Sequence, residues 1–254
     1  MWRSGCGLAL VAATLSLLSP TPVHAQSRGF MALGAAAAPP AGMIGFCRRT
    51  PDACRGPDAS TAEVEAQIDA ATRAYWGQLF VKNDPSPPPG ATNPSPPAPR
   101  SKPSATTAAG SSAQAVGAHI DRSHPLWPQV IAVNTRINAA IRAGDDHRLH
   151  AQDDYWTIPR AAGRAKPVGD CEDFALTKRE QLLALGVPAD ALSIALVTTR
   201  TGLSHAVLLV ATDEGEYVLD NLSPWVIHWS EARLTWRERQ APGEMLKWVK
   251  VVTE

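Results

Sequence analysis

A proline-rich stretch near the middle of the sequence limits where a folded domain can form. Nine prolines fall between Pro85 and Pro103, and Ala, Ser, Thr and Gly dominate the residues that follow. Such a composition cannot bury enough apolar surface to offset the loss of chain entropy, so we predict a disordered linker over residues 84–118. The chain is thereby divided into an N-terminal segment, residues 26–83, and a domain of residues 119–254.

The first 25 residues have the three parts of a secretory signal peptide. Arg3 supplies the positive start, Leu8–Leu18 forms an apolar run of 11 residues, and Val23-His24-Ala25 resembles a cleavage site. The alternative is a membrane anchor, but the run is too short, because a spanning helix needs about 20 apolar residues. We therefore predict a signal peptide over residues 1–25, a periplasmic or secreted protein, and no membrane span after signal removal.

The charge balance narrows the class of partner. The sequence has 24 Lys and Arg residues and 24 Asp and Glu residues, which gives a formal net charge of zero. A neutral chain gives no reason to expect nucleic acid as a partner.

Export would place the cysteines in an oxidising compartment, where pairing is the rule. Cys6 leaves with the signal, and Cys47 and Cys54 lie close together with Pro51 favouring a turn between them. We predict a disulfide between these two cysteines; metal binding by the pair is less favoured, because no histidine or third cysteine lies nearby. Cys171 is then left unpaired, which indicates a thiol that is either buried or used in chemistry.

The order of the expected elements indicates the fold class. Residues 26–45 are rich in Ala, Gly and Pro, and we expect them to be poorly ordered. Downstream, the apolar spacing predicts helices first and strands afterwards, which is typical of an α+β fold with an antiparallel sheet. The expected helices span 61–80, 126–141 and 170–185, and the expected strands span 192–199, 205–211, 217–222, 226–229 and 247–252.

Cys171 stands at the start of the third expected helix, within Gly169-Asp170-Cys171-Glu172-Asp173. A cysteine in the first turn of a helix lies near the positive end of the dipole and near unpaired backbone N–H groups. Both lower a thiol pKa, and the N–H groups can also hold an oxyanion. The alternative is a buried structural cysteine, and the flanking charges and the missing disulfide partner favour the catalytic interpretation.

A thiol nucleophile needs a base, and two histidines follow Cys171. His205 opens an apolar strand, whereas His228 lies among Val, Ile and Trp and is better explained by packing. Asp220 ends the next strand, and a hairpin of this length returns it beside His205, where it can orient the imidazole. The alternatives are a structural His205 and an Asp220 that forms an Asx turn with Asn221. Together, the three residues predict a Cys-His-Asp triad.

The sequence blocks that hold these residues resemble the bacterial transglutaminase-like cysteine proteinase family. The resemblance implies a papain-like or transglutaminase-like core, with the nucleophile-bearing helix packed on an antiparallel β-sheet, and a triad of Cys171, His205 and Asp220. The long proline-rich insert departs from the family pattern. The matching blocks are Gly169–Leu176 with Lys178-Arg179, Ser204–Leu208, Val218–Leu222, Val133-Asn134 with Ile137-Asn138, Asp154-Tyr155-Trp156, and Phe46-Cys47 with Cys54.

The resemblance to LapG-like periplasmic cysteine peptidases of this family implies a substrate and a regulator. It implies cleavage of a large cell-surface adhesin at an Ala-Ala pair, controlled by an inner-membrane cyclic-di-GMP receptor. It also implies calcium, with Asp170 and Glu172 as ligands and Asp153 or Asp154 as a further candidate, because hard carboxylate oxygens suit Ca²⁺. The alternative is that these acidic residues complement the helix dipole. Trp156 is a candidate oxyanion donor or subsite wall, although most tryptophans are expected in the core.

Three other functions fit the same residues. The first is an acyl transferase of the transglutaminase type, with an amine instead of water as acceptor. The second is a non-catalytic periplasmic module that binds calcium or a partner, which has no need to keep the three residues together. The third is hydrolysis of cell-wall amides.

The linker contains Thr107-Ala108-Ala109-Gly110, which is similar to the adhesin cleavage sequence of the LapG-like relatives. We hypothesise that the linker reaches the active site of its own chain and is cut there or blocks it. Incubation of the wild type beside Cys171→Ala tests this hypothesis, and the absence of clipping near Ala108-Ala109 would refute it.

Overall fold

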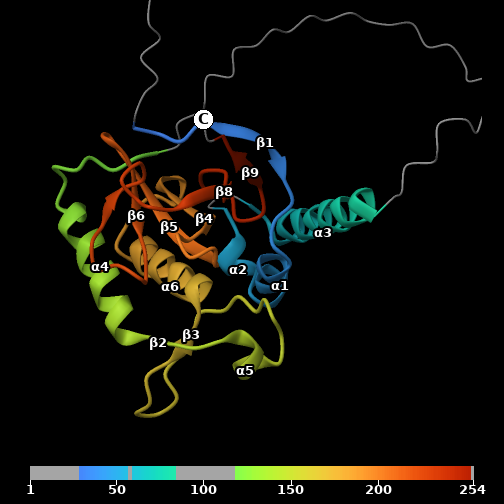
Figure 1. Ribbon diagram of the computed structural model, residues 1–254, viewed down its shortest axis with the longest axis horizontal. Helices are drawn as coiled ribbons and strands as arrows, with labels where there is room; N and C mark the ends of the chain where they lie inside the picture. Colours follow the sequence, from blue (N-terminus) through green and yellow to red (C-terminus); the bar gives the residue numbers. More distant parts are fainter. Residues whose placement is uncertain (1–28, 57–58, 84–117, 253–254) are drawn as a thin grey trace, which may run out of the picture.

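A seven-stranded antiparallel sheet forms the centre of the computed structural model, which describes residues 29–56, 59–83 and 118–252 (Figure 1). The strands follow the order β1-β9-β8-β4-β5-β6-β7. Their bounds are β1 Leu33–Ala37, β4 Leu192–Thr198, β5 Ser204–Thr212, β6 Gly215–Leu219, β7 Ile227–His228, β8 Thr235–Gln240 and β9 Trp248–Val251. A separate parallel pair joins β2, Arg142–Ala143, to β3, Val168–Gly169.

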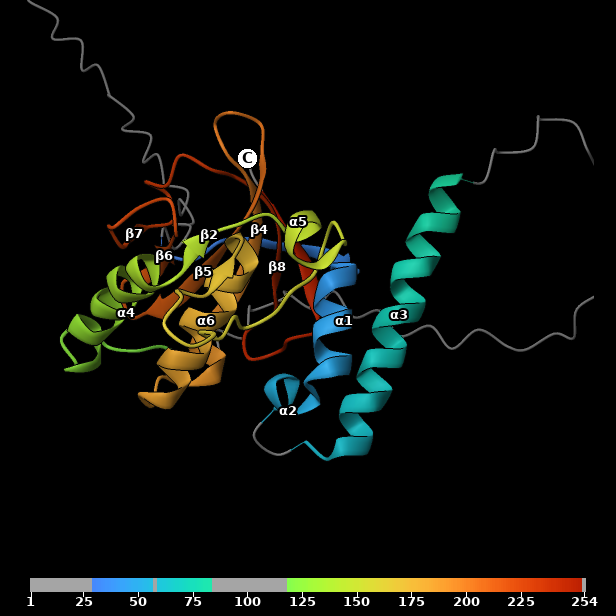
Figure 2. The same cartoon turned by 90° about the horizontal axis from the view of Figure 1, so that it is seen from below.

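The helices form two groups around this sheet. Helix α6 packs on β5 and β4, and α4 packs beside α6, whereas α3 lies along the outer side of α1 and α2 (Figure 2). The predicted α+β class, with the cysteine-bearing helix packed on an antiparallel sheet, is confirmed. The helices are α1 Ala41–Arg49, α2 Pro51–Cys54, α3 Thr61–Asn83, α4 Leu126–Ala140, α5 Asp146–His150 and α6 Cys171–Ala184, with a 3-10 turn at Ala189–Ala191.

Strands β4 and β5 form the central hairpin of the sheet, and their side chains are buried on both faces. Leucine and β-branched residues dominate both strands, as expected where a strand is covered on both sides. Leu208 belongs to the main core that includes Leu182 of α6, and Leu209 belongs to a second cluster with Trp236. Packing on both faces therefore fixes β5, the strand that carries His205.

Residues 29–45 belong to the sheet and the core, so the expectation of poor order is wrong for this part of the chain. Strand β1 is an edge strand that pairs with β9, with Leu33 opposite Val251, and Met43 of α1 is fully buried. A side chain at Gly34 would crowd Val252. Small residues here serve a close approach of backbones, although their composition alone suggested a loose segment.

The elements predicted downstream are present, with small shifts at their ends. The strand expected at 217–222 stops at Leu219, because Asp220 begins a turn in which its Oδ1 accepts a hydrogen bond from the Leu222 N–H at 2.8 Å. Strand β8 was not predicted at all.

The predicted disulfide between Cys47 and Cys54 is confirmed, and it links α1 to α2. Pro51 opens α2 at its first position, where the missing N–H removes no helical hydrogen bond. Cys171 is the free cysteine of the described residues.

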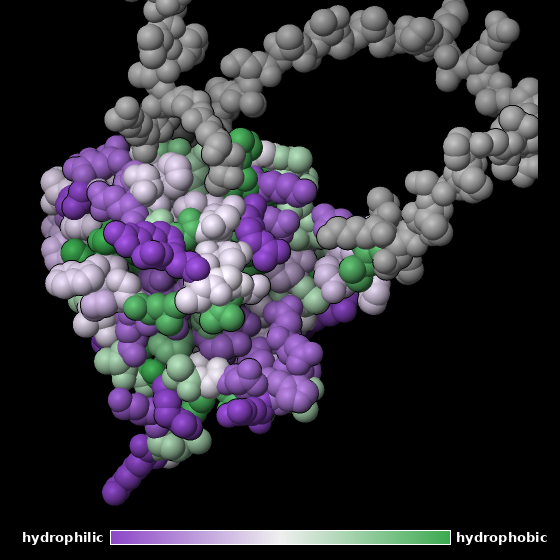
Figure 3. Space-filling view, viewed as in Figure 1, coloured by the Kyte–Doolittle hydropathy of each residue, from purple (hydrophilic) through white to green (hydrophobic). Residues whose placement is uncertain are grey.

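Two of the segments predicted from the sequence fall on residues that the structure does not describe. The signal peptide and the linker with Thr107-Ala108-Ala109-Gly110 lie outside the described residues, except for the last linker position, residue 118. Among the residues that are described, none of the helices combines the length and the apolar character that a membrane crossing requires. On the face drawn in Figure 3, hydrophilic and hydrophobic residues are interspersed across the surface.

Candidate active site

Cys171 is the first residue of α6, and Asp170 is the residue that precedes the helix. Strand β3 leads directly into this turn, and Gly169 lies so close to the Asp173 carboxylate that a side chain there would overlap it. The thiol group is mostly buried, and its Sγ lies 3.1 Å from Oε2 of Glu172. The helix start thus places the sulfur beside a carboxyl group inside the protein.

His205 and Asp220 are brought together by the β5–β6 hairpin. Nε2 of His205 lies 2.8 Å from Oδ1 of Asp220, and both side chains are largely buried. Burial opposes ionisation of Asp220, but hydrogen bonds from His205 and the Leu222 N–H, together with the Lys178 charge, hold its pKa below the usual value. Asp220 is therefore a carboxylate that can orient the imidazole and stabilise its protonated form.

Cys171 and His205 line the same cavity, which has a volume of about 400 Å³. Because Asp220 contacts Nε2 of the imidazole, Nδ1 is the nitrogen that can accept a proton from the sulfur. The wall also includes Trp156, Asp170 and Glu172, and further residues of β4, β5 and β8. The cavity can admit a peptide segment beside the thiol group.

The electrostatic surroundings of Cys171 differ from those predicted from the helix start. Burial first, and then the Glu172 carboxylate, raise the pKa of the thiol above its usual value, while a hydrogen bond from the Ala206 N–H opposes this. The expected lowering of the pKa is therefore wrong for the protein without bound ions. Burial and the neighbouring Glu172 carboxylate are the two largest causes of this rise in the thiol pKa.

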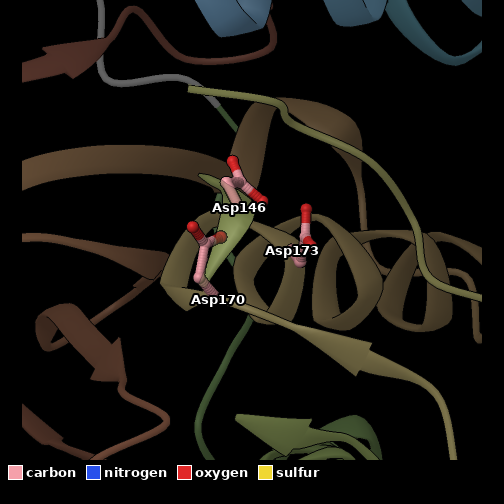
Figure 4. A group of neighbouring side chains, drawn as sticks. All are labelled: Asp146, Asp170 and Asp173. Carbon is pink, nitrogen blue, oxygen red and sulfur yellow. The ribbon is translucent and has the colours of Figure 1, made fainter. Parts of the chain in front are cut away.

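Three carboxylates gather at the start of α6 (Figure 4). One oxygen from each of Asp146, Asp170 and Asp173 lies within 4.8 Å of the others. Asp146 opens α5, Asp170 precedes α6, and Asp173 lies in the first turn of α6. Asp146 Oδ2 accepts a hydrogen bond from the Tyr155 N–H at 2.5 Å, and Asp173 Oδ1 accepts one from the Thr157 N–H at 2.8 Å. The cluster thus also anchors the loop that contains Tyr155 and Thr157.

These carboxylates fit a cation. Asp146 Oδ1, Asp170 Oδ1 and Asp173 Oδ2 are buried and have no hydrogen-bond partner among the described residues. Burial, and then the Glu172 charge, raise the pKa of Asp170 to about 9, and burial raises that of Asp173 to about 8. Carboxyl groups held this close need either protons or a cation to offset their repulsion, and hard oxygen ligands suit Ca²⁺.

The metal ligands that were predicted from the sequence do not all lie in this cluster. Asp170 belongs to the cluster, whereas Glu172 hydrogen-bonds to Asp170 and faces the sulfur. Asp153 is exposed and contacts His147, and both oxygens of Asp154 accept hydrogen bonds, from Gly42 N and Trp156 Nε1. Sequence analysis missed Asp146, because it lies far from Asp170 along the chain and no local motif connects them.

Trp156 was predicted as an oxyanion donor or a subsite wall. Its side chain is buried and lines the cavity, and its Nε1–H donates to Asp154 Oδ1 at 2.6 Å. Because this N–H is already engaged, the position of Trp156 fits the wall and not the donor.

The chain matches the model of a known protein family. A family described as bacterial transglutaminase-like cysteine proteinase matches residues 104–254, which is more than half of the chain and includes Cys171, His205 and Asp220. A comparison with curated proteins gave no match.

Solved structures of Legionella pneumophila LapG are also similar to the chain. The calcium-bound form is 31% identical, with a TM-score of 0.39 over 45% of this chain and 65% of that chain. The EGTA-treated form is 33% identical, with a TM-score of 0.39 over 45% of this chain and 63% of that chain. The matched part of the chain spans less than two thirds of either structure.

Proposed function

Because the chain belongs to the bacterial transglutaminase-like cysteine proteinase family, we propose that it is an exported cysteine peptidase whose triad is Cys171, His205 and Asp220. The observation that carries this proposal is the 2.8 Å contact between His205 Nε2 and Asp220 Oδ1. It lies beside a cavity that His205 shares with a free, half-buried cysteine. A nucleophile, a base and an orienting acid in this order are the parts that acyl transfer requires.

The reaction follows from these positions. The Cys171 sulfur attacks the carbonyl carbon of a peptide bond, and Nδ1 of His205 accepts the thiol proton. Backbone N–H groups at the start of α6 are placed to stabilise the oxyanion. His205 then donates the proton to the leaving amine as the C–N bond breaks, which leaves a thioester. Water hydrolyses the thioester, giving its proton to His205, which returns it to the sulfur.

Asp146, Asp170 and Asp173 are the residues that we propose to hold calcium. A bound cation supplies positive charge that offsets the carboxylates close to Cys171. Support comes from their three unpartnered oxygens and from the raised pKa values of the cluster. Glu172, also predicted as a ligand, contacts both Asp170 and the sulfur, so it couples the cluster to the nucleophile.

The cellular setting is proposed from the sequence and the family. The signal-like start favours the periplasm or secretion, and the resemblance to LapG-like peptidases favours a surface adhesin as substrate and a cyclic-di-GMP receptor as regulator. The residues that line the cavity around Cys171 include four acidic ones, Asp153, Asp154, Asp170 and Glu172. A protein substrate, and no nucleic acid, fits this surface.

The deciding experiment compares the surface proteins released by cells that express the wild type, Cys171→Ala or the control Asp153→Asn. Because Asp153 lines the cavity, a second control, Asp69→Asn, changes an exposed residue of α3 that does not line it. We expect the wild type and Asp69→Asn to release a common protein fragment that Cys171→Ala retains. Identical release from all strains would contradict the proposal.

Product analysis distinguishes hydrolysis from acyl transfer. The purified wild type is incubated with the released protein and an excess of a primary amine, and the new C-terminus is examined by mass spectrometry. A free carboxylate indicates hydrolysis, whereas a C-terminal amide of the added amine indicates acyl transfer. Parallel zymography on peptidoglycan tests hydrolysis of cell-wall amides.

A further inference from the structure

A second cavity lies on the side of α6 that faces α1 and α2 (Figure 1). It has a volume of about 140 Å³ and shares no lining residue with the cavity around Cys171. Two charged side chains of α6, Arg179 and Glu180, form part of its wall. The rest of the wall is apolar and consists of Phe46, Ala53, Ile158, Leu176, Leu183 and Met245.

Arg179 is a buried cation without a partner among the described residues. It is 7% exposed, and its Nε has no hydrogen-bond partner. The ion pairs that the described residues form do not include it. Burial lowers the pKa of its guanidinium group to about 10, so the group still carries its charge at neutral pH. A buried charge without a counterion is unfavourable, and this one borders a cavity that can hold a ligand.

Glu180, the acidic residue of the same wall, is held by a different arginine. Its Oε1 accepts a hydrogen bond from Arg160 at 2.6 Å, and its Oε2 accepts one at 3.0 Å. This two-point contact offsets the charge of the Glu180 carboxylate. Arg179 is therefore the charge of the cavity that the described residues leave uncompensated.

We propose that this cavity, the Arg179 pocket, binds a carboxylate that carries a small apolar body. A guanidinium group matches a carboxylate in charge and in planar geometry, and exclusion of water strengthens the contact. The apolar wall accommodates the body of the ligand, since a cavity of roughly 150 Å³ holds a group the size of benzene. Two sources have this chemistry: a free organic acid such as benzoate, and the C-terminal apolar residue of a polypeptide.

A ligand in the Arg179 pocket would join two parts of the fold. Phe46 on α1 and Ala53 on α2 each precede a cysteine of the Cys47–Cys54 disulfide, and the facing wall belongs to α6. A ligand that touches both walls binds only the folded state, so it should raise the melting temperature. The proposal does not depend on the proposed peptidase function, because the two cavities have separate walls.

The first test measures binding to the purified protein at pH 7 by isothermal titration calorimetry. The probes are benzoate and N-acetyl-leucine, each compared with its neutral amide, benzamide and N-acetyl-leucinamide. We expect one of the acids to bind at least about tenfold more tightly than its amide, because only the acid can pair with Arg179. Tighter binding of benzoate indicates a free organic acid, and tighter binding of N-acetyl-leucine indicates a chain end. Failure of both acids to bind more tightly than their amides would overturn the proposal.

The second test locates the binding site with variants. Arg179→Met removes the charge, whereas Ala53→Leu keeps the charge and fills part of the cavity. We expect each variant to weaken binding of the preferred acid by about tenfold or more and to abolish the rise in melting temperature. The control Arg164→Met changes an exposed arginine outside the wall and should match the wild type.

Unchanged affinity in Arg179→Met would place the acid elsewhere and overturn the proposal. If Arg179→Met fails to fold by circular dichroism, the comparison of acids with amides and the affinity of Ala53→Leu decide. Unchanged affinity in Ala53→Leu then has the same consequence.

Discussion

The reactivity of Cys171 depends on two opposing effects on its thiol pKa, one from the helix start and one from the neighbouring carboxylates. The sulfur is buried and contacts Glu172, and both effects hold the proton on the thiol. In the proposed mechanism the base is His205, and it is positioned by Asp220, whose ionised form is favoured by two hydrogen bonds. This arrangement favours a neutral thiol that is deprotonated by His205 during attack over a preformed thiolate.

Glu172→Gln should make the thiol more reactive in metal-free protein. Removal of the carboxylate charge lowers the pKa of Cys171, so a larger fraction is thiolate at a given pH. The measurement is the rate of iodoacetamide alkylation at pH 7 to 9. The control is Glu180→Gln, which removes a carboxylate that pairs with Arg160 on the surface. A slower rate in Glu172→Gln than in the wild type would contradict the expectation.

Lys178 should also make stability depend on pH. Its folded pKa of about 7 lies below the usual value of about 10.4, so the unfolded chain binds the extra proton between these limits. The contribution to stability is full above about pH 10.4 and is lost as pH falls to 7. As the pH falls from 10 to 6, the wild type should therefore lose stability relative to Lys178→Met. Urea unfolding of both proteins at pH 6 and pH 10 measures this difference.

Among the elements, those with a clear apolar pattern could be predicted, and the rest could not. The helix over Leu126–Ala140 and the strands around His205 show strong periodicity, and the motif around Cys171 is local. β8 has the sequence TWRERQ, whose charges suggest a loop, yet Arg239 is buried because it pairs with Glu216. Such pairing between distant residues leaves no local signal.

The acidic cluster escaped prediction for the same reason. Asp146 reaches Asp170 and Asp173 only because β2 pairs with β3 and brings the start of α5 beside α6. Lys178 was part of a motif, but its burial depends on the packing of α6 on the sheet.

The disulfide between α1 and α2 should contribute to stability but not to chemistry. Replacement of Cys47 and Cys54 by serine opens a small loop, which should lower the free energy of unfolding by roughly 2–3 kcal/mol on the chain-entropy model. Denaturant unfolding of the double variant and of the dithiothreitol-reduced wild type should agree. Loss of Cys171 alkylation in the folded double variant would contradict a purely structural role.

For the whole molecule, a divalent cation should act as a stabiliser. A ligand that binds the folded state alone adds about 2.7 kcal/mol at a concentration 100 times its Kd. We expect calcium to raise the melting temperature and EGTA to reverse this. Asp146→Asn should weaken the effect, while the exposed control Asp153→Asn should preserve it. An equal response from both variants would exclude the cluster as the binding site.

The pairing of β1 with β9 means that the two ends of the described chain complete one sheet. A polypeptide severed between Asn83 and Ala118 would thus yield two fragments that stay associated, each supplying part of a common core. Such a nicked protein would migrate as two bands on a denaturing gel and as one species in size-exclusion chromatography. The two fragments could also be expressed from separate genes and reassembled by mixing.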